Sequence, residues 1–113
     1  MRKIRESEYT KVIALDEPDQ SGSCHEYCVR IDDIHSKASI LFQKGPIKEN
    51  GVNGIQIEDL IAICIDRLEG FQNGPYPCHE NEQALVRLQN ALSWLDSRTK
   101  NRKQRGVEGK NIK

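Results

Sequence analysis

The sequence predicts an α+β fold: a small N-terminal antiparallel β-sheet followed by a two-helix antiparallel hairpin with a long C-terminal helix. Its 113 residues are the length of one domain. Apolar residues form short runs between turn-forming residues in the first half, and they recur every three or four positions in the second half. The change falls near Asn53-Gly54. We therefore expect a single domain over residues 1–113, with a β-rich part at 1–54 and a helical hairpin and basic tail at 55–113.

Three short strands are expected in the β-rich part. The first is rich in β-branched and aromatic residues, and the second alternates with period two, which is typical of a half-buried strand. One face of this second strand carries His25, Tyr27, Val29 and Ile31, and the other carries Glu26 and Arg30. Segments rich in Gly, Pro, Asp, Asn and Ser separate the strands as turns. The strands cover residues 9–15, 24–31 and 39–43.

Two helices are predicted in the second half. The first begins near Ile57 and ends within residues 70–75, where Gly and Pro disfavour a helix. The second begins near Pro77, because proline suits the first helical position, and runs to about Arg105 with a glycine after it. The short connection predicts an antiparallel hairpin. Apolar stripes comprise Ile57, Leu60, Ile61, Cys64, Leu68 and Phe71 in the first helix and Leu85, Leu88, Leu92 and Leu95 in the second.

These two stripes need more cover than two helices provide for each other. They are therefore expected to pack on the sheet, on a partner subunit or on both. Trp94 lies off the leucine stripe of the second helix. It is expected either to contact a second subunit or to pack on the chain's own sheet.

Composition excludes several classes of protein. The longest apolar run, residues 60–65, is far short of the ~18–20 residues that span a membrane. No apolar segment follows the basic N-terminus, so we expect a cytoplasmic protein whose four cysteines are free thiols. Cys24 and Cys28 would lie ~13 Å apart on a strand, which disfavours a zinc site. We expect no metal, no cofactor, no catalytic residue and no enzyme activity, because no phosphate-binding loop or catalytic motif is present.

Charge is divided unevenly although the formal net charge is zero. Residues 96–113 hold seven Lys or Arg against two Asp or Glu, which gives +5, so residues 1–95 carry −5. Arg98, Arg102 and Arg105 are spaced by four and three, so a helix places them on one face. They either form a solvated helix end that complements the dipole or bind phosphate oxygens through bidentate guanidinium groups.

Two residues near the turn between the helices are candidates for binding a nucleobase. Phe71 offers a ring for stacking, unless it closes the end of the apolar stripe. Asn81 offers a donor and an acceptor to a base edge, unless its side chain bonds the helix start. These residues and the arginines lie at opposite ends of a helix of about 40 Å, so a small ligand reaches both only between two antiparallel chains. Such a shared site requires a homodimer.

Two blocks of sequence carry a resemblance to a known family. The first is residues 41–54 (LFQKGPIKENGVNG), and the second includes CHEN at 78–81, ALSWL at 91–95 and RGVEG at 105–109. Together with the helix between them, they resemble the phage Thoeris anti-defence proteins of the first type. The helical hairpin is also similar to that of the phage sponge for the cyclic nucleotides of CBASS defence.

The resemblance implies a phage anti-defence protein that binds and sequesters, without cleaving, a cyclic ADP-ribose-type messenger (glycocyclic ADP-ribose). TIR-domain proteins of the bacterial Thoeris system make this messenger, so the implied location is the cytoplasm of the infected host. Phe71 would stack on the adenine, and Asn81 would bond its edge. Arg98, Arg102 and Arg105 would hold the phosphates at the interface of a homodimer or homohexamer.

Two alternatives remain open at this point. A CBASS-type sponge would bind cyclic di- or trinucleotides, either in the same place or at a second site. A small nucleic-acid-binding module would use the basic tail, but the low aromatic content and the acidic remainder disfavour DNA or RNA as a partner. No membrane partner is expected.

Overall fold

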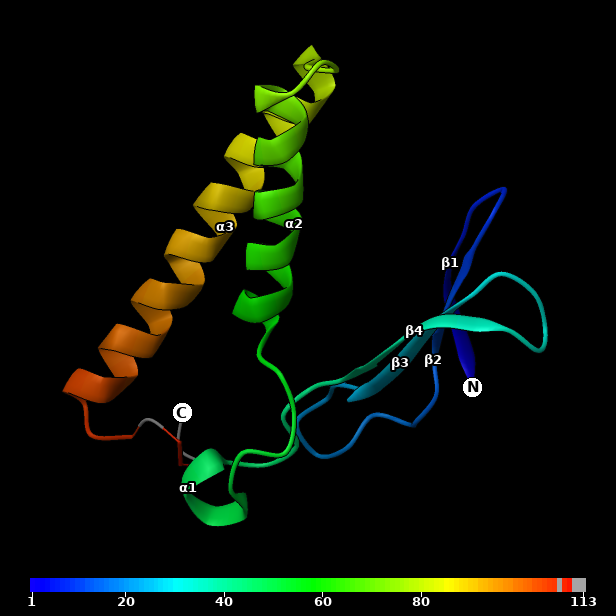
Figure 1. Ribbon diagram of the computed structural model, residues 1–113. Coiled ribbons are helices and arrows are strands. Elements are labelled where there is room, and N and C mark those ends of the chain that lie inside the picture. The colour runs from blue at the N-terminus through cyan, green and yellow to red at the C-terminus, as the bar shows by residue number, and fades with distance from the viewer. Residues whose placement is uncertain (108, 111–113) are drawn as a thin grey trace. The chain divides into compact units, whose positions relative to one another are not determined.

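The computed structural model describes residues 1–107, 109 and 110, and over these it confirms the predicted α+β class (Figure 1). Contacts divide the chain into two compact units, Met1–Ile55 and Gln56–Lys113. That residues 1–113 form a single domain stays a prediction. No helix in this described part of the chain is long and apolar enough to cross a membrane. The elements are β1 (Arg2–Glu6), β2 (Lys11–Ala14), β3 (Glu26–Arg30), β4 (Ser36–Leu41), α1 (Ile47–Asn50), α2 (Ile57–Asn73) and α3 (His79–Gln104).

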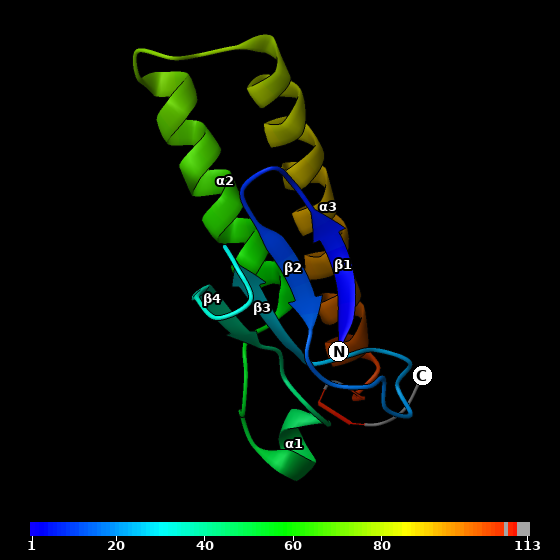
Figure 2. The same ribbon diagram turned by 90° about the vertical axis from the view of Figure 1, so that its right-hand side faces the viewer.

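The first unit is built on a sheet in which β1, β2, β3 and β4 follow one another in chain order (Figure 2). Each strand is antiparallel to its neighbour, as predicted. The sequence analysis misses β1, because its five residues RKIRE include a single apolar side chain and all five are exposed. Backbone pairing with β2 holds β1 in place. Its charged side chains suit an edge strand, since they disfavour pairing with another sheet.

The core of this unit is small and lies at the central strands. Ala14 on β2 is fully buried and pairs with Tyr27 on β3. The Tyr27 ring meets the Phe42 ring edge to face, with centroids 5.7 Å apart. Cys24 and Cys28 are also buried, and all four cysteines are free, as expected. Small residues therefore fill most of the space inside this unit.

The half-buried pattern predicted for residues 24–31 is wrong in detail. Cys28 lies on the opposite face of β3 from Tyr27 and is only 3% exposed, whereas Ile31 is 46% exposed. Cys28 occupies the middle of β3 between two strands, and Ile31 follows the last residue of β3. Burial here depends on how the neighbouring strands cover each residue. The alternation of apolar and polar residues along one strand does not reveal that cover.

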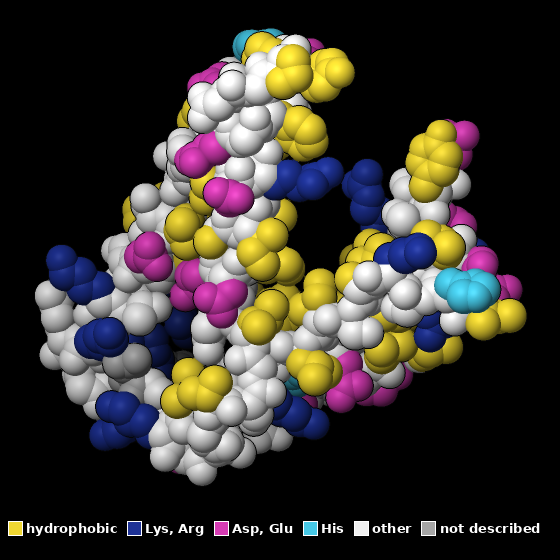
Figure 3. Space-filling model, in the orientation of Figure 1, with side chains coloured by type: hydrophobic (Ala, Val, Ile, Leu, Met, Phe, Trp, Pro, Cys, Tyr) yellow, Lys and Arg dark blue, Asp and Glu magenta, His cyan; other side chains and the backbone are white. Residues whose placement is uncertain are grey.

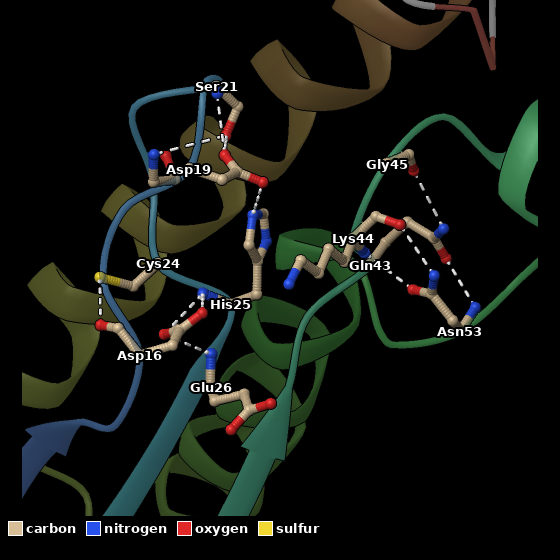
Figure 4. Close-up of polar contacts among 11 residues, drawn as sticks. Asp16, Asp19, Ser21, Cys24, His25, Glu26, Gln43, Lys44, Gly45 and Asn53 are labelled. Carbon is tan, nitrogen blue, oxygen red and sulfur yellow. Dashed lines mark hydrogen bonds and ion pairs between the residues drawn. The ribbon is translucent and has the colours of Figure 1, made fainter.

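Polar side chains close the loop that precedes β3 (Figure 4). The Asp16 carboxylate accepts hydrogen bonds from the backbone N–H groups of His25 and Glu26 at 3.0–3.1 Å. His25 is 9% exposed, and its Nε2 lies 2.7 Å from Oδ2 of Asp19. The loop is therefore tied to the strand at two points, and His25 is a buried histidine with a satisfied ring nitrogen.

Residues 43–54 form a second closed loop, which contains α1 (Figure 4). Its base is closed by side-chain amides: the Asn53 N–H donates to Gln43 Oε1 at 2.9 Å, and Asn53 Oδ1 accepts from the Lys44 N–H at 2.7 Å. The sequence predicts only turns here, and the structure adds the single helical turn α1. Both loops of this unit thus use their polar groups internally.

The second unit is the antiparallel hairpin of α2 and α3, as the sequence predicts (Figure 1). A capping box between Gln56 and Asp59 begins α2, which ends inside the expected range. The predicted start of α3 at Pro77 is two residues early, because Cys78 is the N-cap and its Sγ accepts the Asn81 N–H. The end of α3 lies one residue before the expected Arg105.

The apolar arc of α2 is wider than α3 covers. Ile57 and Cys64 belong to the predicted stripe, yet both are exposed, Ile57 at 54%. Ile65, which the predicted stripe omits, is half-buried. One neighbouring helix covers only part of the arc, and hydrophobic side chains remain exposed along α2 (Figure 3).

Trp94 lies on the far side of α3 from the hairpin contact. It is nine positions from Leu85, which is about half a turn around the helix. Leu85 is the one buried residue of α3, whereas Trp94 is 77% exposed. A contact of Trp94 with a second subunit or with the sheet stays a prediction.

Candidate functional site

Two of the candidate residues on α3, Asn81 and Arg102, lie along the stripe that faces α2. This stripe advances by four and three residues along the whole helix, and its members are half-buried or buried. Asn81 occupies its first position and Arg102 its last. The two kinds of candidate side chain therefore mark the two ends of one helix face. The stripe consists of Asn81, Leu85, Leu88, Leu92, Leu95, Thr99 and Arg102.

Phe71 stands at the turn end of the hairpin, on the last turns of α2. Its side chain is 38% exposed, so the ring does not close a buried core. The guanidinium carbon of Arg67 lies over the ring, 5.1 Å from its centroid. This cation–π contact covers one face of the ring. A base that stacks on Phe71 would use the other face.

Asn81 lies at the same end, in the first turn of α3. Its backbone N–H donates to Sγ of Cys78 at 3.4 Å, so the cysteine caps the helix. The Asn81 side-chain amide makes no hydrogen bond to any other residue within 1–107, 109 and 110. The side chain that caps the start of α3 is therefore Cys78 and not Asn81. The amide of Asn81 keeps its donor and acceptor for a base edge.

The arginines lie at the opposite end of α3, where Lys and Arg side chains gather (Figure 3). Arg98 is exposed on the helix surface. Nη2 of Arg102 donates to the carbonyl oxygens of Val107 at 3.2 Å and Lys110 at 3.0 Å. Arg105 is the C-cap residue, and its backbone N–H donates to the Asn101 carbonyl. Part of Arg102 thus already binds oxygen acceptors, and its other nitrogens keep the geometry for an anion.

One chain does not bring all five candidates together. The structure places Phe71 and Asn81 at the turn end, and it places the arginines at the other. Asn81 and Arg102 are separated by about 32 Å along α3 at 1.5 Å per residue. The geometric argument for a second chain therefore holds for the observed helix.

Two further residues at the turn end are missed by the sequence analysis. Arg67 precedes Phe71 by four positions, and this spacing for a cation and a ring is a signal that the sequence carries. Gln72 bonds the backbone of Cys78 across the turn. No spacing rule reveals Gln72, because its partner lies on the other side of a loop.

The sheet unit carries a small open pocket that the sequence does not predict. Its volume is about 170 Å³, below the ~300–1,000 Å³ typical of small-molecule sites. Within the described ranges, 1–107 and 109–110, no three His, Cys, Asp or Glu side chains are grouped to hold a metal ion. The pocket is lined by His25, Glu26, Leu41, Phe42, Lys44 and Asn53.

Comparison with known proteins identifies the family of the hairpin. The model of the Acb2/Tad1 hairpin domain matches residues 35–100, more than half of the chain. The chain belongs to the Acb2/Tad1 hairpin-domain family. The matched domain includes Phe71, Asn81 and Arg98, whereas Arg102 and Arg105 lie beyond the match.

A phage relative extends this finding. Over 82 residues the chain is 50% identical to a protein of Bacillus phage SBSphiJ7 named Thoeris anti-defense 1. The alignment covers 72% of this chain and 58% of that protein, so the chain spans little more than half the length of its relative. The resemblance drawn from the two sequence blocks is thereby confirmed.

Proposed function

We propose that the protein is a phage anti-defence sponge, which binds a cyclic ADP-ribose-type messenger of the Thoeris system and holds it intact. The observation that carries the proposal is the family match over a hairpin with a ring and an amide at one end and Arg98 near the other. A relative named for Thoeris anti-defence supports the same role. The protein would act in the cytoplasm of the infected host.

The proposed site is shared between chains. The turn end of one hairpin supplies Phe71 for the adenine face and Asn81 for its edge. The arginine end of a second hairpin supplies Arg98, Arg102 and Arg105 for the pyrophosphate, through charge-assisted hydrogen bonds. The exposed apolar arc of α2 supports a further partner, because one neighbouring helix leaves it uncovered. A homodimer is the smallest assembly that completes the site, and a homohexamer contains it as well.

A sponge works by stoichiometric binding and needs no bond cleavage. Its dissociation constant must lie below the concentration of the signal, and nanomolar binding corresponds to about −12 kcal/mol. A stacked base and several paired phosphate charges are suited to this affinity. The proposal therefore includes neither a catalytic residue nor a cofactor.

Calorimetry with glycocyclic ADP-ribose isomers tests the proposal, followed by recovery of the ligand from denatured complex. We expect nanomolar binding of at least one isomer and recovery of an unchanged ligand. Failure to bind every isomer, or recovery of a cleaved product, would contradict it. Cyclic di- and trinucleotides added as competitors test the alternative ligand class. A monomer mass in solution would contradict the shared site.

A further inference from the structure

The side chain of Gln72 links the end of α2 to the beginning of α3. Its Oε1 accepts a hydrogen bond from the Cys78 N–H at 3.0 Å. Its Nε2 donates to the Cys78 carbonyl oxygen at 3.1 Å and lies 3.4 Å from Oε2 of Glu82. One half-buried amide thus satisfies both backbone groups of a single residue across the turn.

This contact continues into the candidate base-binding residues. Cys78 is the N-cap of α3, and its Sγ accepts the backbone N–H of Asn81. Gln72 itself follows Phe71 directly on α2. A chain of bonded groups therefore runs from the residue beside the ring to the residue that carries the edge-reading amide.

We propose that Gln72 is a positioning residue that sets adenine specificity, and this inference rests on the proposed function. A base stacked on Phe71 has its edge in a fixed plane, and the Asn81 amide reads that edge only within hydrogen-bond distance, about 2.7–3.2 Å. Gln72 fixes the cap of α3 against the last turn of α2. It thereby holds the Asn81 amide at a fixed position relative to the ring. Groups that bind a ligand together must be held within about 0.5 Å of their productive positions.

Comparing two bases gives a measurement that a change in the stability of the fold alone would not alter. A carboxamide pairs with adenine by accepting from its amino group and donating to a ring nitrogen. At the edge that carries N7, hypoxanthine has a carbonyl in place of that amino group. It therefore offers two acceptors where adenine offers a donor and an acceptor, and turning the amide over does not restore both bonds. Preference for the adenine ligand over its hypoxanthine counterpart therefore reports where the Asn81 amide lies.

The test compares Gln72→Met with Gln89→Met, a matched change at an exposed glutamine of α3. The probes are a cyclic ADP-ribose isomer that the wild-type protein binds and the same isomer with hypoxanthine, measured by calorimetry. We expect Gln72→Met to weaken adenine-ligand binding about tenfold and to reduce the preference, because both bonds to Cys78 are lost. Gln89→Met should change neither quantity.

An Asn81→Ala background separates positioning from general destabilisation. In that background Gln72→Met should leave the remaining base preference unchanged, because the amide that it positions is gone. Should Gln72→Met fail to fold, the double change Gln72→Glu with Glu82→Gln serves instead, since it keeps the acceptor for the Cys78 N–H, loses the donor to the Cys78 carbonyl and avoids two adjacent carboxylates.

The outcomes distinguish the two proposals. If the wild-type protein binds no isomer, the proposed function fails. If it binds and prefers adenine while Gln72→Met keeps the full preference, the positioning role alone is wrong. A wild-type protein that binds without preferring adenine also overturns the positioning role.

Discussion

The loops of the sheet unit and the turn end of the hairpin differ in how far their polar side chains are bonded within the chain. In the sheet unit, Asp16 and His25 secure one loop, and Gln43 and Asn53 close another (Figure 4). In the hairpin, the Asn81 amide has no partner among the residues described by the structure. Hydrogen bonds that shape a loop leave little capacity for a ligand. We therefore expect the polar groups of the sheet unit to specify structure, and the proposed recognition to lie in the hairpin.

The two units also differ in which apolar side chains they bury. The sheet unit buries Ala14, Cys24 and Cys28, whereas Leu85 is the one apolar side chain buried to that degree in the described hairpin. Both units also expose large apolar side chains: Ile63 on α2 is 62% exposed, and Ile34 in the sheet unit is 84% exposed. Exposed apolar surface of this kind marks contact surfaces more often than isolated side chains do. For the hairpin, the proposed shared site gives such a surface a partner, and we expect the exposed apolar arc of α2 to contact a second chain.

The largest predicted effect concerns the two ends of the hairpin. Phe71→Ala and Arg98→Ala should each weaken messenger binding by about 2–5 kcal/mol, because the base loses its platform or a phosphate charge loses its partner. Refolded together in equal amounts, they should form mixed dimers in which one of two sites is intact. About a quarter of all sites then recover, and the stoichiometry from calorimetry measures this fraction.

The control for this experiment uses two changes at the same end. Arg98→Ala refolded with Arg102→Ala should recover no site, because every mixed site contains one damaged arginine end. Equal recovery in both mixtures would show that the site is not shared in the proposed way.

The next largest effect is expected from changing one glycine in each unit to alanine. A Cβ at Gly54 would collide with the Phe42 carbonyl and lie 2.7 Å from the Gln43 nitrogen, whereas a Cβ at Gly70 would have no neighbour within 4 Å. Gly54→Ala should therefore lower the free energy of unfolding by about 1–3 kcal/mol. Gly70→Ala, inside α2, should raise it by about 0.5–1 kcal/mol. Urea unfolding measures both, and equal stabilities would contradict the close approach at Gly54.

A smaller effect is expected at the turn end. Arg67→Met should lower the free energy of unfolding of the hairpin by about 0.5–1 kcal/mol, because the cation–π contact with Phe71 is lost. In a Phe71→Leu background the same change should cost almost nothing. Urea unfolding of the wild-type protein, the two single variants and the double variant gives a double-mutant cycle. An identical loss of unfolding free energy in both backgrounds would argue against the contact.

Particular residues show what the sequence could predict. Local periodicity located both helices, and it placed Phe71 and Asn81 beside one turn because both lie within a few residues of it. Periodicity failed for β1, where the charged residues around Ile4 give no apolar alternation and pairing with β2 decides the structure. It failed also for Gln72, whose role depends on a backbone across the turn. These two features depend on partners across a turn, whereas Arg67, which was also missed, follows an i, i+4 spacing that the sequence does carry.

The smallest predicted effect concerns pH and the sheet unit alone. Hydrogen bonds from the Ser21 hydroxyl and N–H, and then from His25, lower the pKa of Asp19 from 3.8 to about 2. Because the folded pKa lies below the unfolded value, the stabilising effect of ionised Asp19 is complete above about pH 4 and is lost as pH falls toward 2. Asp19→Asn should therefore flatten the fall in unfolding free energy over this range, measured by urea unfolding at a series of pH values. The matched change Asp33→Asn, at an aspartate outside these bonds, should leave the slope unchanged. Messenger binding near neutral pH should be the same in both variants, because the groups proposed to bind it all lie in the hairpin.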